Sequence, residues 1–331
     1  MTQVKGRAVR IRGAGGPEVL ELDDTFETRA AGPGEVRVEV VAAGLNRADC
    51  LQRRGVYPAP AGVPKDVPGL ELAGRVEAVG LGVTAWKVGD HVMAITGGGA
   101  MATHVVMHER ELVAIPDGLG FEGAGAIPEV FFTAYDALAR AELRAGEVLL
   151  VHAIASGVGT AALQLGKAMG AHVIGTSRSA DKLEGCRDLG LDDGLLVDDT
   201  IQFANAVKAT APRGADVVLD TVGAKYLAEN LRALAVNGRV VTIGLLGGVR
   251  GELDLGLLLA KRATWHGSVL RSRPLEEKAT LAQAFTREVL PLFRRQKLRP
   301  IVDAVLPMTE IRAAHERMEK DAIFGKLVLR W

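Results

Sequence analysis

The segment AGLNRADCLQRRG, residues 43–55, brings together side chains that could do chemistry: Asn46, Asp49 and Cys50, with arginines close by. An asparagine amide can donate a hydrogen bond to an oxygen that becomes negatively charged during a reaction. A cysteine thiolate is a common zinc ligand. The segment is therefore either the ligand arm of a zinc enzyme or the arm of an enzyme that works without metal, and the rest of the sequence has to decide between them.

A second candidate site is the turn in VHAIASGVGTAALQLG, residues 151–166, where a strand-like run is followed by small residues and a helix-like run. Such a turn lets the pyrophosphate of a dinucleotide approach the backbone and the positive end of the helix dipole. Aligned with the GxGxxG pattern, the glycine positions are Ile154, Ser156 and Gly159, and only the third is a glycine. The context of strand, turn, helix and second strand favours a dinucleotide site, and a turn that holds no ligand is the alternative. The residues expected to contact the pyrophosphate are Ser156, Gly157, Val158 and Gly159.

The end of the next apolar strand indicates which dinucleotide binds. Ser177 stands where an NAD enzyme usually places an acidic residue for the ribose 2′-hydroxyl. A serine hydroxyl can donate to a 2′-phosphate, and Arg178 and Lys182 can neutralise that phosphate. We therefore predict NADPH as the cofactor. The alternative is that Arg178 and Lys182 only form the solvated start of a helix.

The elements that would position these residues fall into three zones. Up to about residue 120, alternating apolar and polar side chains with frequent glycine and proline predict short strands of a mostly antiparallel sheet or barrel. Beyond it, continuous apolar runs alternate with helical stretches, which is typical of a parallel sheet covered on both faces. The tail has no complete fold of its own and is expected to return to the first zone. We expect the boundaries to give residues 1–124, 125–268 and 269–331.

The composition excludes several classes of function. Forty Lys and Arg residues balance forty Asp and Glu residues, which argues against a nucleic acid or an anionic membrane as partner. No segment has the apolar core of a signal peptide or the length of a membrane span. The two cysteines, Cys50 and Cys186, are far apart, which excludes a disulfide framework and an all-cysteine metal site. A reduced, cytoplasmic chain is the simplest expectation.

Several longer motifs carry a family resemblance. AAGLNRADCLQRRGVYPAP, PGLELAGRVEAVG, VGDHVMAI, AIPEVFFTAYDAL, SGVGTAALQL and LRSRP occur in this order. The sequence resembles the zinc-independent quinone oxidoreductases, the zeta-crystallin-like group of the medium-chain dehydrogenase/reductase superfamily. The resemblance implies an α/β fold with a GroES-like, β-rich catalytic domain, completed by the C-terminal segment, and an inserted Rossmann domain with a doubly wound parallel sheet. It also implies NADPH as cofactor and a homodimer.

The resemblance answers the question about metal. Zinc alcohol dehydrogenases of this superfamily have their first zinc ligand where this chain has Asn46 and a histidine ligand where it has Leu70. A leucine cannot coordinate a metal, and a neutral amide is a poor zinc ligand. The hydroxyl that relays the alcohol proton is also missing, because Ala48 stands in its place. We therefore expect an arm without metal.

The same resemblance assigns further site residues. Asn46 matches the asparagine near the nicotinamide ribose and the substrate, and Tyr57 matches a tyrosine at the mouth of the cleft that could donate its phenol proton. Plain packing is the alternative for Tyr57, and Asp49 is expected to orient Arg47 or the arm itself. Lys326 matches a basic residue that can approach a phosphate. The complete set of further cofactor positions is Thr133, Gly244, Leu245, Leu270, Arg271, Ser272 and Lys326. Val197 stands where some relatives have a tyrosine near the 2′-phosphate, so we expect only modest discrimination against NADH.

These residues favour one function and leave two others open. Without a Lewis acid and a relay hydroxyl, alcohol oxidation loses both its polarising group and its proton path. Hydride transfer to an acceptor that is already electron-poor, such as a quinone, needs mainly positioning and hydrogen bonds. The leading hypothesis is an NADPH-dependent, zinc-free quinone reductase. The alternatives are a reductase of enone or enoyl-thioester double bonds and an NADPH-binding protein with little turnover.

Overall fold

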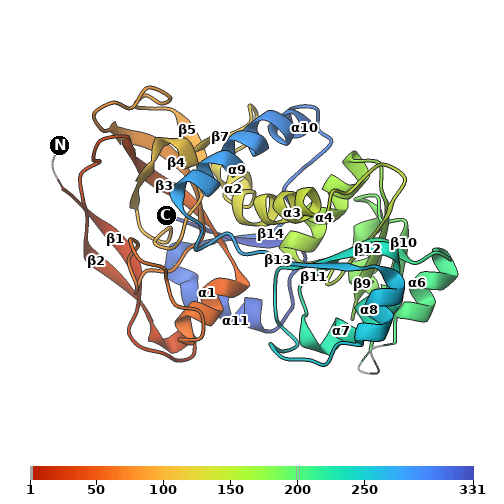
Figure 1. The fold of residues 1–331 in the computed structure, drawn as a ribbon. Helices are drawn as coiled ribbons and strands as arrows, with labels where there is room; N and C mark the ends of the chain where they lie inside the picture. The colour runs from red at the N-terminus through yellow and green to blue at the C-terminus, as the bar shows by residue number, and fades with distance from the viewer. Residues whose placement is uncertain (1–2, 199, 201) are drawn as a thin grey trace. The chain divides into compact units, whose positions relative to one another are not determined.

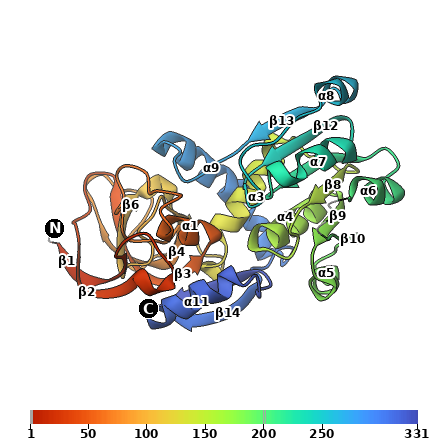
Figure 2. The same cartoon turned by 90° about the horizontal axis from the view of Figure 1, so that it is seen from below.

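The structure is a computed structural model that describes residues 3–198, 200 and 202–331. The described chain divides into two compact units. Unit 1 takes the chain up to Phe132 together with Leu270–Trp331, and unit 2 takes Thr133–Val269. In Figures 1 and 2 the blue C-terminal elements can be followed into the same unit as the red and orange N-terminal ones. The domain boundaries expected from the sequence stay predictions. Within the described part of the chain, no helix has both the length and the apolar character that a bilayer span needs.

Unit 1 is built on a mostly antiparallel sheet, as the alternating N-terminal zone predicted. Its strands in spatial order are β14 (Val302–Pro307), β15 (Lys326–Arg330), β3 (Glu35–Leu45), β4 (Glu71–Val79), β5 (His91–Ile95) and β7 (Val113–Ala114), and β6 (His104–His108) pairs with β3. The pairing of β14 with β15 is parallel, and the others are antiparallel. A separate antiparallel pair consists of β1 (Val4–Ile11) and β2 (Leu20–Thr28).

Unit 1 also contains helices. They are α1 (Arg47–Arg53), α2 (Phe121–Ala124), α9 (Leu275–Glu288), α10 (Leu290–Arg294) and α11 (Ile311–Glu319), with short 3₁₀ helices η1 (Pro17–Val19), η2 (Glu109–Glu111) and η4 (Met308–Glu310). Helix α3 (Pro128–Arg140) begins in unit 1 and ends in unit 2.

The core of unit 1 explains why the C-terminal strand returns to the N-terminal part of the chain. Val36, Val38 and Val40 lie on one face of β3, because side chains alternate along a strand, and all are buried. Leu327 and Leu329 of β15 join them in the same hydrophobic cluster. Full burial of such an aliphatic side chain contributes about 1.5–3 kcal/mol. The antiparallel register places Leu327 opposite Leu45, which brings Lys326 beside the end of β3, where the arm begins.

Unit 2 has the strand order of a Rossmann fold. Its parallel sheet runs β10 (Asp193–Leu196), β9 (His172–Ser177), β8 (Val148–Val151), β11 (Ala215–Asp220), β12 (Leu234–Thr242) and β13 (Thr264–Gly267). Numbered within the unit, this is the order 3-2-1-4-5-6. The remaining elements are α4 (Gly157–Ala168), α5 (Ala180–Arg187), α6 (Ala204–Thr210), η3 (Ala224–Tyr226), α7 (Leu227–Ala233) and α8 (Leu255–Lys261). Figure 2 shows α4 and α7 on opposite faces of the sheet, so the predicted doubly wound fold is confirmed.

Candidate active site

The arm of unit 1 is fixed by one carboxylate. Asp49 Oδ2 accepts the backbone N–H of Asn46 at 2.8 Å, and its Oδ1 accepts that of Gly69 at 2.8 Å. Gly69 has a φ of +106°, and a Cβ there would lie 2.5 Å from the backbone nitrogen of Met101, so only glycine fits at this contact. Burial raises the pKa of Asp49 to about 6, although the two N–H donors act in the opposite direction. Asp49 therefore orients the arm itself, while Arg47 pairs with Asp321 instead.

Asn46 belongs to a buried ion-pair cluster. Its Nδ2 donates to Glu71 Oε1 at 2.9 Å and to the Gly44 carbonyl at 3.3 Å, and its Oδ1 accepts from Lys326 Nζ at 2.7 Å. Lys326 Nζ also donates to Glu71 Oε1 at 2.5 Å and to the Leu45 carbonyl at 2.9 Å. Both amide donors of Asn46 are engaged inside unit 1. A hydrogen bond from Asn46 to a substrate oxyanion would require one of them to be released.

Lys326 is engaged with other residues of unit 1, and its expected contact with a phosphate stays a prediction. An ammonium has three N–H donors, and Lys326 uses them on Glu71, Asn46 and the Leu45 carbonyl. The side chain is also nearly inaccessible, at 4% exposed. The sequence could not show this, because Lys326 and Asn46 are 280 residues apart and meet only through the register of β15 on β3.

Tyr57 lies against a buried arginine. The Arg271 guanidinium carbon is 4.8 Å from the centre of the Tyr57 ring, a cation–π contact. Arg271 donates to the carbonyls of Tyr57 at 3.0 Å and Gly97 at 2.7 Å, and to Gln52 Oε1 at 2.5 Å. Burial raises the pKa of the Tyr57 phenol, Arg271 opposes this, and Glu129 adds to it. Arg271 thus orders the loop that carries Tyr57, and its expected contact with the cofactor stays a prediction.

Glu129 is the functional candidate that sequence reasoning missed. It is the second residue of α3, and its backbone N–H donates to Glu71 Oε2 at 2.8 Å. Burial raises the pKa of its half-buried carboxyl to about 8; Glu71 and Asp49 add to the rise, while Lys326 and Arg271 oppose it. A single acidic residue inside the apolar run AIPEVFF was the available signal.

The glycine turn of unit 2 fits a dinucleotide pyrophosphate. Ser156 caps α4, because its Oγ accepts the Gly159 N–H at 3.0 Å. The backbone N–H groups of Gly157 and Val158 have no partner within the helix and lie at its positive end. A Cβ on Gly159 would lie 2.4 Å from the Ala153 carbonyl oxygen, so the third glycine is required by close packing. The turn follows β8, next to the point where the strand order reverses, where such folds bind dinucleotides.

The residues expected at the adenosine side of the cofactor gather after β9. Ser177 ends this strand, and its Oγ accepts the Ser179 N–H at 3.1 Å. Ser179 in turn caps α5 by accepting the Lys182 N–H at 3.3 Å. Arg178 is exposed and Lys182 is half-buried. Ser177 and Lys182 are therefore held close together by one helix start.

The remaining predicted cofactor residues lie on α3, after β12 and before α9. Thr133 is half-buried on α3, and Gly244 and Leu245 follow β12, with Leu245 exposed. Leu270 is buried and Ser272 is exposed in unit 1. Their contacts with a cofactor stay predictions.

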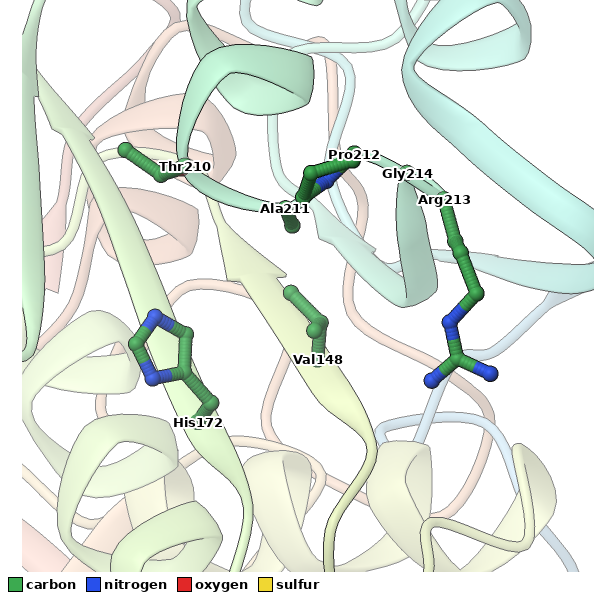
Figure 3. A pocket seen from close by; sticks show the side chains of 7 residues that line it. All are labelled: Val148, His172, Thr210, Ala211, Pro212, Arg213 and Gly214. Carbon is green, nitrogen blue, oxygen red and sulfur yellow. The ribbon is translucent and has the colours of Figure 1, made fainter.

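A depression of about 210 Å³ in unit 2 does not contain these residues. Figure 3 shows its lining, with His172 and Arg213 on opposite sides. Val148 and His172 begin β8 and β9, so it lies at the amino ends of the strands. Dinucleotides bind at the carboxyl ends in this fold. The depression is therefore not the cofactor site.

Cys50 lies in the hydrophobic core of unit 1. Its Sγ is 3.5 Å from His315 Nδ1, and Arg53 donates to the same nitrogen at 3.1 Å. Burial raises the pKa of Cys50 to about 12, and burial together with Arg53 lowers the pKa of His315 to about 3. Across residues 3–198, 200 and 202–331, the structure brings together no group of three His, Cys, Asp or Glu side chains that could hold a metal ion.

Comparison with known proteins gives the family. Two family models match: the alcohol dehydrogenase GroES-like domain over residues 32–117, and the zinc-binding dehydrogenase model over residues 157–287. The chain is 35% identical to a quinone oxidoreductase of Pseudomonas aeruginosa, over 98% of this chain and 99% of that protein. The chain belongs to the quinone oxidoreductase group of the medium-chain dehydrogenase/reductase superfamily. This medium-chain oxidoreductase thus has the predicted GroES-like domain and a nicotinamide cofactor-binding domain.

Solved structures of medium-chain reductases superpose along the whole chain. The JamJ enoyl reductase in its apo form matches with a TM-score of 0.87 and 28% identity, over 99% of both chains. An NAD-dependent alcohol dehydrogenase matches with a TM-score of 0.86 and 34% identity, over 98% of this chain and 99% of that one. These structural relatives are therefore named for different activities.

Proposed function

We propose that this medium-chain oxidoreductase is an NADPH-dependent, zinc-free reductase that transfers reducing equivalents to quinones. The observation that carries the proposal is the ammonium of Lys326 on the Asn46 amide oxygen, at 2.7 Å. A dication at this place would be repelled by the ammonium, and buried Leu70 offers no ligand atom. An acceptor reduced here must therefore already be electron-poor.

The chain's own residues support binding of the dinucleotide. When bound, the reduced nicotinamide supplies the hydride. The backbone N–H groups of Gly157 and Val158 hold the pyrophosphate, and Ser177 with Lys182 takes the 2′-phosphate. Tyr57 is the proposed proton donor to the reduced acceptor, because its ring is held against Arg271 in the loop that follows the arm.

The preference for NADPH can be tested at Ser177. A carboxylate in the Ser177→Asp variant would repel a 2′-phosphate and accept the ribose 2′-hydroxyl of NADH. We expect kcat/KM with NADPH to fall by roughly tenfold or more, the size of a lost charge-assisted hydrogen bond. The NADH value measured on the same variant is the control and should hold or rise. An equal fall with both cofactors would show that Ser177 does not read the 2′-phosphate.

The enoyl reductase neighbour supports a second candidate, reduction of enone or enoyl-thioester double bonds. Such substrates are polarised by conjugation and need no metal either. For the phosphate of a carrier, the arm offers Arg47, Arg53 and Arg54. Arg53 is fully buried and all three pair with acids, Arg47 with Asp321 and the other two with Glu319, which makes this candidate weaker. A protein that binds NADPH with little turnover remains a third candidate.

The deciding experiment is NADPH consumption with ortho-quinones, para-quinones and enones, run beside NADH and with a chelator present. Chelator-insensitive turnover of quinones with NADPH is expected. Loss of turnover with chelator would overturn the metal-free proposal. Turnover of enones alone would establish the second candidate. NADPH binding without turnover of any acceptor would establish the third.

We also propose a homodimer through unit 2, where β13 is an edge strand and α8 exposes Leu255 and Leu259. A cytoplasmic location is proposed as well. Cys50 and Cys186 are both free and buried, which suits a reducing compartment.

A further inference from the structure

Unit 1 gathers an odd number of charges around the arm. Three carboxyls lie there, those of Asp49 on α1, Glu71 on β4 and Glu129 on α3, together with two cations, Lys326 on β15 and Arg271 before α9. Lys326 pairs directly with Glu71, whereas Arg271 donates to uncharged oxygens. With every group ionised, this cluster would carry one uncompensated negative charge in a mostly buried space. An unpaired buried charge is costly, and a carboxyl usually takes up a proton instead. One of the three acids is therefore the natural place for a proton.

The hydrogen bonds identify which acid carries it. Asp49 accepts two backbone N–H groups. Glu71 accepts from Lys326, from the Asn46 amide and from the Glu129 backbone. The oxygens of both carboxyls are thus occupied by N–H donors, and Glu71 also pairs with the Lys326 ammonium. Among the described residues, the carboxyl of Glu129 receives no donor. Glu129 is also half-buried rather than sealed, so water can exchange its proton.

The electrostatic balance agrees with this assignment. Burial and the neighbouring carboxylates raise the pKa of Glu129 to about 8, above the value of about 6 for Asp49. Glu129 is thus largely neutral at pH 7 and ionises as the pH rises through about 8. Between about pH 6 and about pH 8 the cluster is therefore balanced, with two carboxylates against Lys326 and Arg271.

The charge on Glu129 acts on the phenol of Tyr57. Arg271 lies over its ring and lowers the pKa of the phenol, while an ionised Glu129 raises it, on top of the rise due to burial. A phenol that gives up its proton leaves a phenolate, which Arg271 stabilises and a neighbouring carboxylate destabilises. The charge on Glu129 therefore changes how readily Tyr57 can donate.

We propose that Glu129 is a positioning residue that holds a proton beside Tyr57 and thereby keeps the phenol a competent proton donor at neutral pH. The inference rests on the proposed function. There, hydride transfer leaves a hydroquinone anion, the Tyr57 O–H bond breaks, and its proton neutralises that anion. The phenolate then takes a proton from solvent. Once Glu129 ionises, the Tyr57 proton is held more tightly and this transfer slows.

The test follows Tyr57 directly, without cofactor or acceptor. Tyrosine labelled with ¹³C at Cζ gives a signal that moves on ionisation, and the chain has only three tyrosines. The Tyr57→Phe variant assigns the Tyr57 signal. In Glu129→Gln we expect the Tyr57 titration to move to lower pH than in the wild type. The matched control, Glu122→Gln on α2, removes a solvent-side carboxyl that pairs with Arg330 and should leave the titration unchanged.

A second measurement keeps the proposal testable if Glu129→Gln folds poorly. Carboxyl infrared spectra of the wild type should show a protonated acid at pH 7 that is lost as the pH rises through about 8. The proposal is overturned if the Tyr57 titration is the same in Glu129→Gln and in the wild type. It is also overturned if no carboxyl of the wild type ionises in this pH range.

Turnover then separates the inference from the proposed function. We expect kcat/KM with a quinone to decline above about pH 8 in the wild type, and to lose this decline in Glu129→Gln. Failure to reduce any quinone would end the proposed function while leaving the two titrations intact. Unmoved titrations with normal quinone turnover would end only the inference.

Discussion

At the scale of single residues, Lys326 determines what the arm can do. Its ammonium bridges Glu71 and Asn46 at the start of the arm. The cation is part of the folded chain, so no ion has to be recruited to balance Glu71. The cost is that Lys326 and Asn46 are engaged with each other and are poorly available to a ligand. In the proposed reaction, proton donation is therefore assigned to Tyr57, whose ring lies against Arg271.

The Glu71–Lys326 pair should be essential for stability. In the Glu71→Gln variant the ammonium stays buried without its carboxylate, and breaking a buried pair on one side typically costs about 3–5 kcal/mol. Urea unfolding of the variant should show a loss of this size. Glu122→Gln, which breaks the solvent-side pair with Arg330, is the control and should cost no more than about 1 kcal/mol. Equal losses of unfolding free energy in the two variants would show that burial does not make the Glu71–Lys326 pair more important than an exposed pair.

Glu129 should make stability depend on pH. Its pKa in the folded chain, about 8, lies above the ordinary glutamate value of 4.5, so folding takes up a proton between these pH values. The stability contributed by this group is complete below about pH 4.5 and is lost as the pH rises to about 8. Glu129→Gln cannot ionise, so its free energy of unfolding relative to the wild type should rise between pH 5 and pH 9. A constant difference across this range would show that Glu129 is ionised in the folded protein.

At the scale of elements, the sequence predicted what depends on local pattern. Alternating strands, continuous apolar strands and the strand–turn–helix unit around Ser156 are all local features, and each is found in the structure. The contact of Lys326 with Asn46 depends on which strands pair and in which register, and no local pattern records that. Glu129 was missed for a related reason. The pKa of its carboxyl is raised by burial and by Glu71 and Asp49, which come from other elements.

The start of α4 offers a test of the cofactor turn. In Gly159→Ala the new Cβ would lie 2.4 Å from the Ala153 carbonyl oxygen, so the turn must shift and the N–H groups of Gly157 and Val158 move with it. We expect NADPH affinity, measured by fluorescence titration, to fall by about tenfold or more, as for loss of a charge-assisted contact. The control is Gly256→Ala in α8, where the Cβ would meet only an Asp254 side-chain oxygen at 3.3 Å. Unchanged affinity in Gly159→Ala would place the pyrophosphate elsewhere.

At the scale of the whole molecule, unit 2 exposes apolar side chains near one edge of its sheet. Val236, Leu255 and Leu259 are all more than half exposed, and they belong to β12 and α8 beside the edge strand β13. Unpaired edge strands and contiguous apolar surface both favour association. An association through such an edge closes most simply as a twofold pair, in which the same patch meets itself.

The oligomeric state should therefore depend on α8. We expect the wild type to have the mass of two chains in size-exclusion chromatography with light scattering, because a self-complementary apolar patch is buried in the pair. In Leu255→Asp/Leu259→Asp, each contact would bury carboxylates, so the mass should fall to that of one chain. Leu81→Asp is the control: Leu81 is 81% exposed in unit 1, and a charge there should leave the pair intact. A double variant that keeps the mass of two chains, or a Leu81 variant that loses it, would move the interface away from α8. Because the substituted leucines are solvent-exposed in the single chain, loss of the pair should not unfold it, and circular dichroism of the separated chains would check this.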